Sequence, residues 1–247
     1  MKTYKATITG INGFIGNALN KKLQSMGWET GEQLRPDVDY VFLFGSPSSN
    51  DWFGSALSYS VRETIENFLN AADFCRDNKI RLIYPSSGTV YEGQTPYSKT
   101  RMILDILNGI YKDNILGLRI FAGYGVGEKH KGKYASVIYQ FIQEMKSGKS
   151  PVIWGDGRQT RDFIYIDDVI DLIIKNKDLT GVVDIGTGIN TSLLEVVKMI
   201  NEELHTKIKP MHIPKPEQYI NDTVCQKPCK IKVSLKDGIK RIINEYL

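Results

Sequence analysis

The stretch TGINGFIG at residues 9–16 decides the fold of this chain. It follows residues 4–9, which we predict to form a strand, and it precedes a helical pattern that Gly27 ends. The apolar positions that share one face of that helix are Ile15, Leu19, Leu23 and Met26. Glycines in such a turn let the backbone approach a pyrophosphate, and the helix N-terminus adds N–H groups and partial positive charge. We therefore predict a dinucleotide-binding turn, whose cofactor contacts are Gly10, Asn12, Gly13, Phe14, Ile15 and Gly16.

Strand and helix patterns alternate after this turn. The next predicted strands are residues 40–44, 81–84 and 115–121. The helices between them are residues 58–76 and a helix from about Tyr97, with Ile103, Ile106, Leu107 and Ile110 on its apolar face. Such alternation is typical of an α/β fold in which a doubly wound parallel sheet of the Rossmann-like kind carries helices on both faces.

The regular alternation of strand and helix patterns ends after Gly127, where the polar loop EKHKGK follows. We predict a dinucleotide-binding domain over residues 1–127, with contributions to its sheet from about residues 150–185. Most of residues 128–247 is expected to form a smaller C-terminal lobe. The helices predicted in this lobe are residues 135–145 and residues 191–204, the second with Thr191 as its N-cap and Glu195 in its first turns.

Composition and charge narrow the class of protein. The 247 residues carry a formal charge of +4, with 41% hydrophobic and 24% charged residues, which excludes a disordered or collagen-like chain. The charges are spread along the chain and no apolar stretch reaches about 18 residues, so neither nucleic-acid binding nor membrane insertion is predicted. Three cysteines cannot all pair, which favours a reduced, cytoplasmic setting. Cys225 and Cys229 lack zinc-type spacing with His205 or His212, so no metal site is predicted.

The sequence does not assign the residue that binds the adenosine ribose. A dinucleotide site normally has an acidic residue roughly 20 positions after the turn, at the end of the second strand. Here Glu29 and Glu32 occupy a stretch too short for a full strand, helix and strand, and we expect residues 27–39 to be irregular. NAD is the expected cofactor, and NADP stays open.

Six motifs together resemble one protein family. They are TGINGFIG (residues 9–16), PSSGTVYE (85–92), TPYSKTR (95–101), LRIFAGYGVG (118–127), WGDGRQTRDFIYIDDV (154–169) and DIGTGINTSLLEVV (184–197). In this order they resemble the NAD-dependent epimerase/dehydratase family of extended short-chain dehydrogenases/reductases, which act on nucleotide sugars. Beside that family the chain looks shortened in two places, between its first helix and Tyr40 and between Ser87 and Tyr97. The resemblance implies that the smaller lobe binds the nucleotide sugar.

The resemblance implies a catalytic Tyr-x-x-x-Lys pair. Tyr97 matches the tyrosine, whereas Arg101 stands at the lysine position, and both are expected to contact the cofactor as well. Lys99 does not replace that lysine, because helical side chains two positions apart diverge and those four apart share a face. A fixed cation beside a tyrosine favours tyrosinate, and arginine supplies the charge although it cannot give up a proton itself. The alternative is that Arg101 is a surface residue of the helix.

Two hydroxyl residues upstream complete the implied catalytic group. Ser87 matches the family's catalytic serine, and Thr89 looks like the residue that offers a second hydroxyl to the sugar. Both are therefore expected to bind substrate. The alternative for Ser87 is an ordinary Ser-Ser turn after a strand. The absence of an Asp-Glu pair after Ser87 argues against a 4,6-dehydratase.

Arg161 matches an arginine that, in the family, binds the nucleotide diphosphate. Bidentate bonding between a guanidinium and a phosphate is the chemical reason. The alternative is a structural salt bridge with a nearby carboxylate, for which the candidates are Asp162, Asp167 and Asp168. Asp168 itself is expected to cap or pack rather than to bind ligand.

Two departures from the family leave the substrate open. Ala122 stands where an asparagine often lies near the diphosphate, and residues 212–229 lack the usual arginine-containing motif. We predict an NAD(P)-dependent nucleotide-sugar epimerase that oxidises a sugar hydroxyl transiently to a ketone. The alternatives are an NAD(P)H-dependent 4-keto-nucleotide-sugar reductase and a non-catalytic nucleotide-sugar- or dinucleotide-binding relative. The resemblance also implies a homodimer through a helix pair that includes the Tyr97 helix.

Overall fold

The computed structural model of the chain describes residues 3–48, 50–111, 114–217 and 219–245. It divides into two compact units. Unit 1 comprises Met1–Ile120 and Ile170–Val183, and unit 2 comprises Phe121–Val169 and Asp184–Leu247. None of the described helices is both long enough and apolar enough to cross a membrane.

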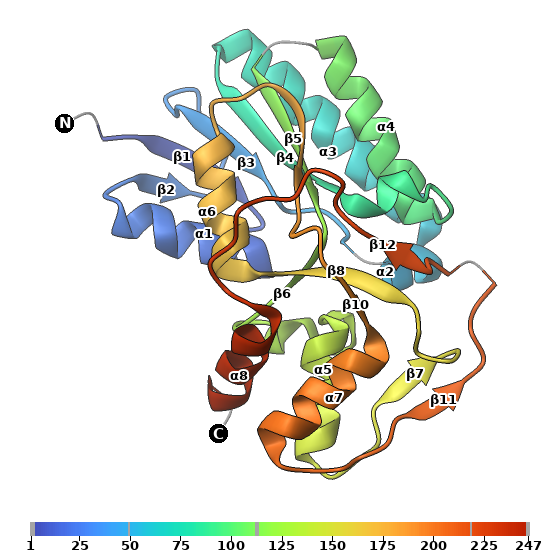
Figure 1. Cartoon of the computed structure of the whole chain (residues 1–247). Coiled ribbons are helices and arrows are strands. Elements are labelled where there is room, and N and C mark those ends of the chain that lie inside the picture. The colour runs from blue at the N-terminus through green and yellow to red at the C-terminus, as the bar shows by residue number, and fades with distance from the viewer. Residues whose placement is uncertain (1–2, 49, 112–113, 218, 246–247) are drawn as a thin grey trace. The chain divides into compact units, whose positions relative to one another are not determined.

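Unit 1 is built on a six-stranded sheet in the order β2-β1-β3-β4-β5-β9 (Figure 1). Its strands are β1 (Lys5–Thr9), β2 (Glu29–Gly31), β3 (Tyr40–Leu43), β4 (Arg81–Ser87), β5 (Ile115–Ile120) and β9 (Gly181–Ile185). The pairings that join β2, β1, β3, β4 and β5 are all parallel. Their short apolar runs are buried, as expected for strands covered on both faces.

Helices cover the two faces of this sheet, so the predicted doubly wound parallel sheet is confirmed. Helices α1 (Phe14–Ser25) and α6 (Ile166–Asn176) lie on one face, where Lys22 pairs with Asp171 at 3.5 Å. The long helices α3 (Leu57–Asn78) and α4 (Pro96–Tyr111) lie on the other face (Figure 1). One core cluster there joins strand and helix side chains, among them Val41, Leu82, Phe68, Ala72 and Leu104.

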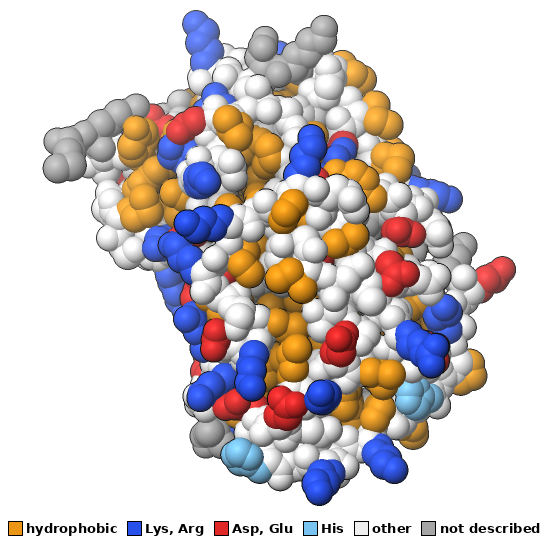
Figure 2. Space-filling view, in the orientation of Figure 1, with side chains coloured by type: hydrophobic (Ala, Val, Ile, Leu, Met, Phe, Trp, Pro, Cys, Tyr) orange, Lys and Arg blue, Asp and Glu red, His pale blue; other side chains and the backbone are white. Residues whose placement is uncertain are grey.

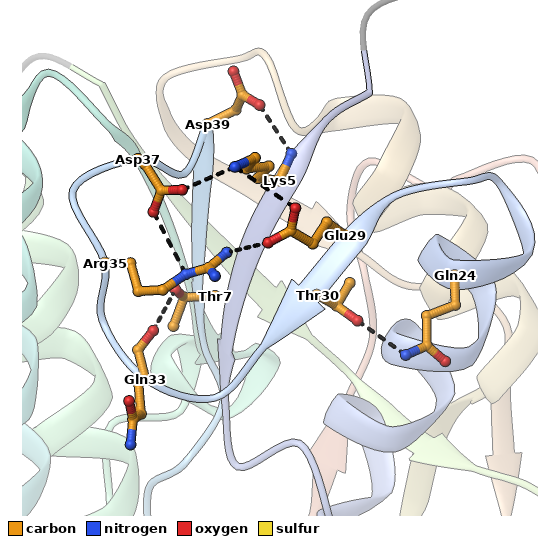
Figure 3. A network of polar contacts seen from close by, with 9 residues as sticks. All are labelled: Lys5, Thr7, Gln24, Glu29, Thr30, Gln33, Arg35, Asp37 and Asp39. Carbon is orange, nitrogen blue, oxygen red and sulfur yellow. Dashed lines mark hydrogen bonds and ion pairs between the residues drawn. The ribbon is translucent and has the colours of Figure 1, made fainter.

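The connection from β2 to β3 is short and contains no helix. In the usual dinucleotide fold a further strand lies beyond the second one, which gives the order 3-2-1-4-5-6. Here the next strand, β3, pairs with the other side of β1, so the sheet ends at β2. The return segment crosses β1, where the buried Thr7 hydroxyl donates to the carbonyl of Gln33 at 2.8 Å (Figure 3).

The expectation that residues 27–39 are irregular was wrong, because they contain β2. A three-residue strand is stabilised by pairing with β1, which is not visible in its own sequence. Charged residues fix the segment that follows: Arg35 donates to Glu29 at 2.8 Å, and Lys5 pairs with Asp37 at 2.9 Å (Figure 3). Pairing with these partners raises the pKa of Lys5 and Arg35 and lowers that of Glu29 and Asp37.

Most of the apolar face predicted for helix α4 is exposed. The side chains that it buries are Ser98, Thr100, Arg101, Leu104 and Asn108. Of the residues expected on its apolar face, Ile103, Ile106 and Ile110 are 39%, 60% and 68% exposed, whereas Leu107 packs against the core cluster. The face of α4 directed at the sheet is therefore more polar than the face it presents outward. Met26, also expected on an apolar face, is exposed at the end of α1.

Unit 2 holds short strands and three α-helices. Its strands are β6 (Ala122–Tyr124), β7 (Val152–Trp154), β8 (Thr160–Tyr165), β10 (Asn190–Ser192), β11 (Met211–Ile213) and β12 (Asp222–Thr223). Its helices are α5 (Val137–Lys146), α7 (Leu193–Leu204) and α8 (Leu235–Glu245). Of residues 150–185, expected to contribute to the first sheet, only β9 does so, whereas β8 pairs with β6, β10 and β12 and β7 pairs with β11.

Two buried carboxylates tie the loops of unit 2 together. Asp162 of β8 accepts hydrogen bonds from the amide and hydroxyl of Thr187 and from the amides of Gly188 and Cys225, at 2.6–3.0 Å. Asp168 accepts from the amides of residues 232 and 233. A buried carboxylate needs several donors, because an unpaired charge in the interior is costly. These two acids are structural rather than free to bind a ligand.

Candidate active site

The glycine-rich turn lies between β1 and α1, as the sequence predicts. Gly10 has a positive φ of 68°, and its carbonyl accepts from the amide of Gly13 at 2.8 Å. A Cβ atom on Gly16 would lie 2.2 Å from that carbonyl oxygen. The tight turn therefore requires glycine at residues 10 and 16 for two separate reasons, backbone conformation and close approach.

The start of α1 is open to an anion. Its N-cap, Gly13, makes no side-chain capping bond, and the first turn contains no acidic residue. The first amides of a helix have no partner within it and carry partial positive charge. The turn therefore presents backbone N–H groups in the manner required for a pyrophosphate.

A second glycine loop, which the sequence analysis did not assign to the site, packs against the first. It is the segment Gly45-Ser46-Pro47 after β3, and a Cβ on Gly10 would lie 2.7 Å from the Cα of Gly45. The amide of Gly45 donates to the hydroxyl of Thr9 at 3.1 Å. The glycine directly after an apolar strand was the available signal. Only the parallel pairing of β1 with β3 makes these loops neighbours.

Arg101 joins this second loop to β4. Its Nη1 donates to the carbonyl of Pro85 at 3.0 Å, and its Nη2 donates to the Ser46 hydroxyl at 3.1 Å and the Pro47 carbonyl at 2.6 Å. The side chain is only 2% exposed, so the alternative that Arg101 is a surface residue was wrong. Lys99, two positions earlier, is exposed.

The charge of Arg101 has an unusual environment. The three acceptors just named are two carbonyls and a hydroxyl, and no described carboxylate pairs with it. Its Nε is buried and has no hydrogen-bond partner among the described residues. A buried, uncompensated cation with an open donor favours a negative or strongly accepting group nearby.

Tyr97 lies in the first turn of α4, directly above Arg101 on the same face. The guanidinium carbon is 5.1 Å from the centre of the Tyr97 ring, a cation–π distance. Phe53 of α2 (Asn50–Ser55) meets the same ring edge-on, with centroids 5.4 Å apart. Phe53 is fully buried and was not identified from the sequence. These two contacts hold the tyrosine ring from two sides.

Ser87 and Thr89 are brought together at the end of β4. The Ser87 Oγ accepts from the amide of Thr89 at 3.2 Å and from its hydroxyl at 3.0 Å, at the start of the 3₁₀ turn η1 (Gly88–Tyr91). Pro85, the residue that Arg101 binds, is two positions before Ser87. Parallel strands of such a sheet end at one edge, where α/β folds bind ligands. The predicted site residues of unit 1 all belong to this edge.

Arg161 lies in unit 2, on β8, where its guanidinium binds backbone carbonyls. Its guanidinium donates to the carbonyls of Thr160, Ile220 and Asn221 at 2.7–2.9 Å and lies 5.4 Å from the ring centre of Tyr219. The three candidate carboxylates have other partners. Asp162 and Asp168 accept from backbone amides, and Asp167 accepts from Arg241. Arg161 therefore organises residues 219–221.

A known protein family shares this sequence pattern. A sequence model described as the NAD dependent epimerase/dehydratase family matches residues 30–177, more than half of the chain. The chain belongs to this family. The match begins at β2 and includes Ser87, Tyr97 and Arg101.

Individual members of the family differ in how much of the chain they match. The ADP-L-glycero-D-manno-heptose-6-epimerase of Brachyspira hyodysenteriae is 31% identical over 184 residues, which are 65% of this chain and 58% of that protein. The chain thus spans less than three fifths of that relative's length. The UDP-N-acetylglucosamine 4-epimerase of Methanobrevibacter ruminantium M1, solved with UDP-N-acetylmuramic acid, has a TM-score of 0.88 at 21% identity and covers 100% and 99% of the two chains.

Another protein of similar structure was solved as a complex with NAD. This UDP-glucose 4-epimerase from Thermus thermophilus has a TM-score of 0.83 at 17% identity, with 98% of each chain covered. At such identities the structures of the family show the fold alone. They agree with a parallel sheet flanked by helices in unit 1.

Two of the three cysteines are buried thiols whose pKa is raised. Among the described residues, no cluster of histidine, cysteine and acidic side chains could hold a metal ion. All three cysteines are free thiols. Burial raises the pKa of Cys75 to about 12 and that of Cys225 to about 11, which makes both poor nucleophiles and ligands.

Proposed function

We propose that this chain is an NAD-dependent nucleotide-sugar epimerase. The observation that carries the proposal is a continuous line of contacts across the carboxyl edge of the sheet. It runs from Gly10 to the Gly45 loop, from there to Arg101, and from Arg101 to Pro85 beside Ser87. A dinucleotide turn and a Tyr/Ser pair are thereby parts of one site.

The residues present fit a nicotinamide dinucleotide. The cradle around Gly10, Gly13 and Gly16 would be filled by side chains at these positions, and the Nε of Arg101 is an open donor. When bound, the dinucleotide supplies a hydride acceptor that returns the hydride later. We propose that Gly10, Asn12, Gly13, Phe14, Ile15 and Gly16 hold its pyrophosphate end and that Tyr97 and Arg101 lie at its reactive end.

In the proposed reaction Tyr97 accepts the proton of a sugar hydroxyl as the carbon that bears it is oxidised. Ser87 donates to the oxygen that becomes a ketone, and Thr89, which hydrogen-bonds Ser87, orients that serine and the sugar. Arg101 holds the tyrosine ring from behind and supplies the fixed positive charge. The ketone rotates so that hydride returns to its opposite face. The stereocentre is thereby inverted, and no net oxidation results.

We propose that Glu32 binds the adenosine ribose and selects NAD over NADP. Glu32 directly follows β2, at the edge where the turn after β1 lies, because the two strands pair in parallel. A carboxylate there accepts from ribose hydroxyls and repels a 2′-phosphate. Arg35, the nearest cation in the sequence, is held by Glu29 and Asp37 and is not offered to a phosphate (Figure 3).

We propose that Arg161 contributes positive charge toward the substrate diphosphate and shapes the segment that binds the nucleotide. Its Nη groups already bind carbonyls of residues 160, 220 and 221. Lys215 adds a second cation next to Tyr219, with its Nζ 5.7 Å from the ring centre. This pair stands in place of the arginine motif that the sequence lacks.

Native mass spectrometry of the purified protein, with turnover assays on UDP- and ADP-sugars, tests the function. We expect NAD to co-purify and a sugar stereocentre to invert without net consumption of cofactor. Tyr97→Phe is expected to abolish turnover and leave the melting temperature unchanged. Steady oxidation of NADH with a keto-sugar would establish the reductase instead, and unchanged turnover in Tyr97→Phe would contradict the assigned chemistry.

The lysine variant Arg101→Lys tests the role of the guanidinium. A lysine keeps the charge but cannot span the acceptors at Ser46, Pro47 and Pro85 with its single ammonium group. We expect retained turnover together with a lower melting temperature. Arg101→Met, which removes the charge, is expected to be folded but inactive. A folded Arg101→Lys without activity would contradict the charge role.

We propose a cytoplasmic homodimer in which α4 lies in the interface. Ile103, Ile106 and Ile110 form an exposed apolar row on α4, and hydrophobic side chains gather along this helix in the space-filling view (Figure 2). Elsewhere on the face shown, positive and negative side chains are interspersed. Light scattering should show a dimer, and the double variant Ile106→Lys with Ile110→Lys should be a monomer. The control Leu179→Lys, at an exposed leucine outside α4, should remain a dimer. A dimer that survives the double variant would place the interface elsewhere.

A further inference from the structure

We propose that Arg119 is a positioning residue, which holds the turn that carries Thr89 against the helix that carries Tyr97. The inference rests on the proposed function for its catalytic meaning. Its structural part rests only on contacts within unit 1. Arg119 lies on β5, and neither it nor its partners belong to the residues assigned to chemistry above.

Arg119 connects two elements that the catalytic residues occupy. Its Nε donates to the Oδ2 of Asp105 on α4 at 2.8 Å, and its Nη1 donates to the hydroxyl of Tyr91 at 2.9 Å. The guanidinium also lies 5.0 Å from the centre of the Tyr91 ring. One side chain therefore binds Tyr91 both through its hydroxyl and through its π face.

Tyr91 is the last residue of η1, the turn that begins directly after Ser87. Its side chain is 53% exposed, so burial contributes little to its placement. The same short turn contains Thr89, whose amide and hydroxyl bind Ser87. A displacement at Tyr91 therefore passes within two residues to the hydroxyls proposed to bind the sugar.

Asp105 gives Arg119 a rigid support. It lies two helical turns beyond Tyr97 on α4, and its Oδ1 accepts from the hydroxyl of the fully buried Tyr84 at 3.0 Å. Asn108 donates to that hydroxyl and to the carbonyl of Gly181 on β9. Gly117 of β5 leaves room for the Tyr84 hydroxyl, because a Cβ at this position would lie 2.5 Å from the Tyr84 oxygen.

The Arg119–Asp105 ion pair lies between the helix that carries Tyr97 and the turn that carries Thr89. The Asp105 side chain is 7% exposed and that of Arg119 25%, so both charges are largely removed from water. An ion pair of this kind adds little stability relative to apolar residues, but its directed hydrogen bonds restrict how the two groups can be arranged. Its consequence is a fixed distance between η1 and α4.

The chain contains a matched cluster that lacks the connection to the site. At the far end of α4, Arg76 pairs with Asp73 at 2.8 Å and lies 5.8 Å from the ring centre of Tyr111, whose hydroxyl donates to Asp73 at 2.9 Å. The same three residue types thus occur on α3 and α4 without contact to η1. Tyr111→Phe is the control for Tyr91→Phe, since each removes one hydroxyl and keeps the ring.

The test compares these two variants in the full chain with NAD bound. We expect Tyr91→Phe to lower kcat about tenfold, because small misplacements of reacting groups are expensive in rate, with the Kd for NAD unchanged. Hydrogen exchange of residues 85–95 should become faster. Tyr111→Phe should change neither kcat nor the hydrogen exchange of residues 85–95. Asp105→Asn, which weakens the support of Arg119, should reproduce the effects of Tyr91→Phe.

Equal behaviour of the two tyrosine variants, in both turnover and hydrogen exchange, would overturn the positioning role. Faster exchange at residues 85–95 with unchanged kcat would also overturn it, because the turn would then be held without consequence for reaction. A wild-type protein that turns over no nucleotide sugar would contradict the proposed function. The exchange comparison would in that case still decide whether Arg119 holds the turn.

Discussion

At Gly16 a single added methyl group would lie 2.2 Å from the carbonyl oxygen of Gly10. No side-chain rotation relieves such a contact, because the backbone fixes the position of a Cβ and the oxygen belongs to the backbone of the same turn. The pyrophosphate-binding geometry is therefore sensitive to the smallest possible substitution. Gly109 on α4 provides a comparison, since a Cβ there would meet nothing within 4 Å.

Gly16→Ala is expected to weaken NAD binding about tenfold or more, since overpacking of this kind costs about 1–3 kcal/mol and about 1.4 kcal/mol corresponds to a factor of ten. The shift of the turn that relieves the contact also withdraws the amides at the start of α1. Titration calorimetry with NAD measures the effect. The control Gly109→Ala should bind NAD normally and be more stable by about 1 kcal/mol, the usual helix preference. Wild-type affinity in Gly16→Ala would show that the turn does not hold the cofactor.

Arg101 illustrates what a sequence predicts at the scale of one residue. Its position one turn after Tyr97 follows from helical spacing, and the structure places it beside that ring. Its acceptors do not follow, because Pro47 lies in a loop 54 positions away along the chain and Pro85 lies in β4, 16 positions away. For the same reason neither the Gly45 loop nor Phe53 was predicted as part of the site.

Among the elements, α4 shows why the apolar face of a helix need not be its buried face. The pattern correctly identifies an apolar stripe, but burial within one chain depends on what packs against the helix. Here the inward face carries Arg101 and Asn108, which hydrogen-bond loops and β9, and the apolar face remains exposed. Helices and strands themselves were predicted well where the apolar period is long, as in α1 and α3.

Helix α7 gives a second correction and a prediction. Its N-cap is Ser192 rather than the expected Thr191, which lies in β10 paired with Arg161. The Ser192 hydroxyl accepts from the amide of Glu195, and the Glu195 carboxylate accepts from the Ser192 amide and hydroxyl, a complete capping box. Adjacent Thr and Ser are equally good caps by type, so only the backbone path of β10 distinguishes them.

Ser192→Ala is expected to lower the free energy of unfolding by about 1 kcal/mol at neutral pH. The hydrogen bonds from Ser192 lower the pKa of Glu195 below its ordinary value of 4.5. Their stabilisation is therefore present above that value and is lost as the pH falls through the lower, folded-state pKa. Urea unfolding of wild type and variant should show the difference between them narrowing below pH 4.5. A difference independent of pH would exclude the carboxylate from the cap.

For the whole molecule, the sequence order of strands predicted the class of fold but not where the sheet ends. The parallel alternation was enough to predict a doubly wound sheet, and this is confirmed. A short segment after β2 replaces the helix and outer strand of the usual fold. In the sequence this replacement was visible only as a shortened segment between the first helix and Tyr40. Neither the β2–β1 pairing nor the Thr7–Gln33 bond can be read from local sequence, because both join segments distant along the chain.

Both units are discontinuous, which predicts how the chain unfolds. The chain passes between them after residues 120, 169 and 183, and the last crossing falls inside β9. Neither unit is completed by one continuous segment, so we expect a single cooperative transition with equal calorimetric and van't Hoff enthalpies. Asp162→Asn, which weakens the loop contacts of unit 2, should move that one transition to lower temperature. Two resolved transitions in the calorimeter would contradict the prediction.

The charged network around β2 disfavours the addition of another strand at this edge of the sheet. Strand β2 is the edge of its sheet, and an unpaired edge is a template on which another chain can add a strand. This edge has only three residues, and the charged side chains of Glu29 and Arg35 lie on it (Figure 3). An incoming strand would have to strip water from these charges and would gain few backbone hydrogen bonds in return. The sheet can therefore end early without becoming a starting point for aggregation.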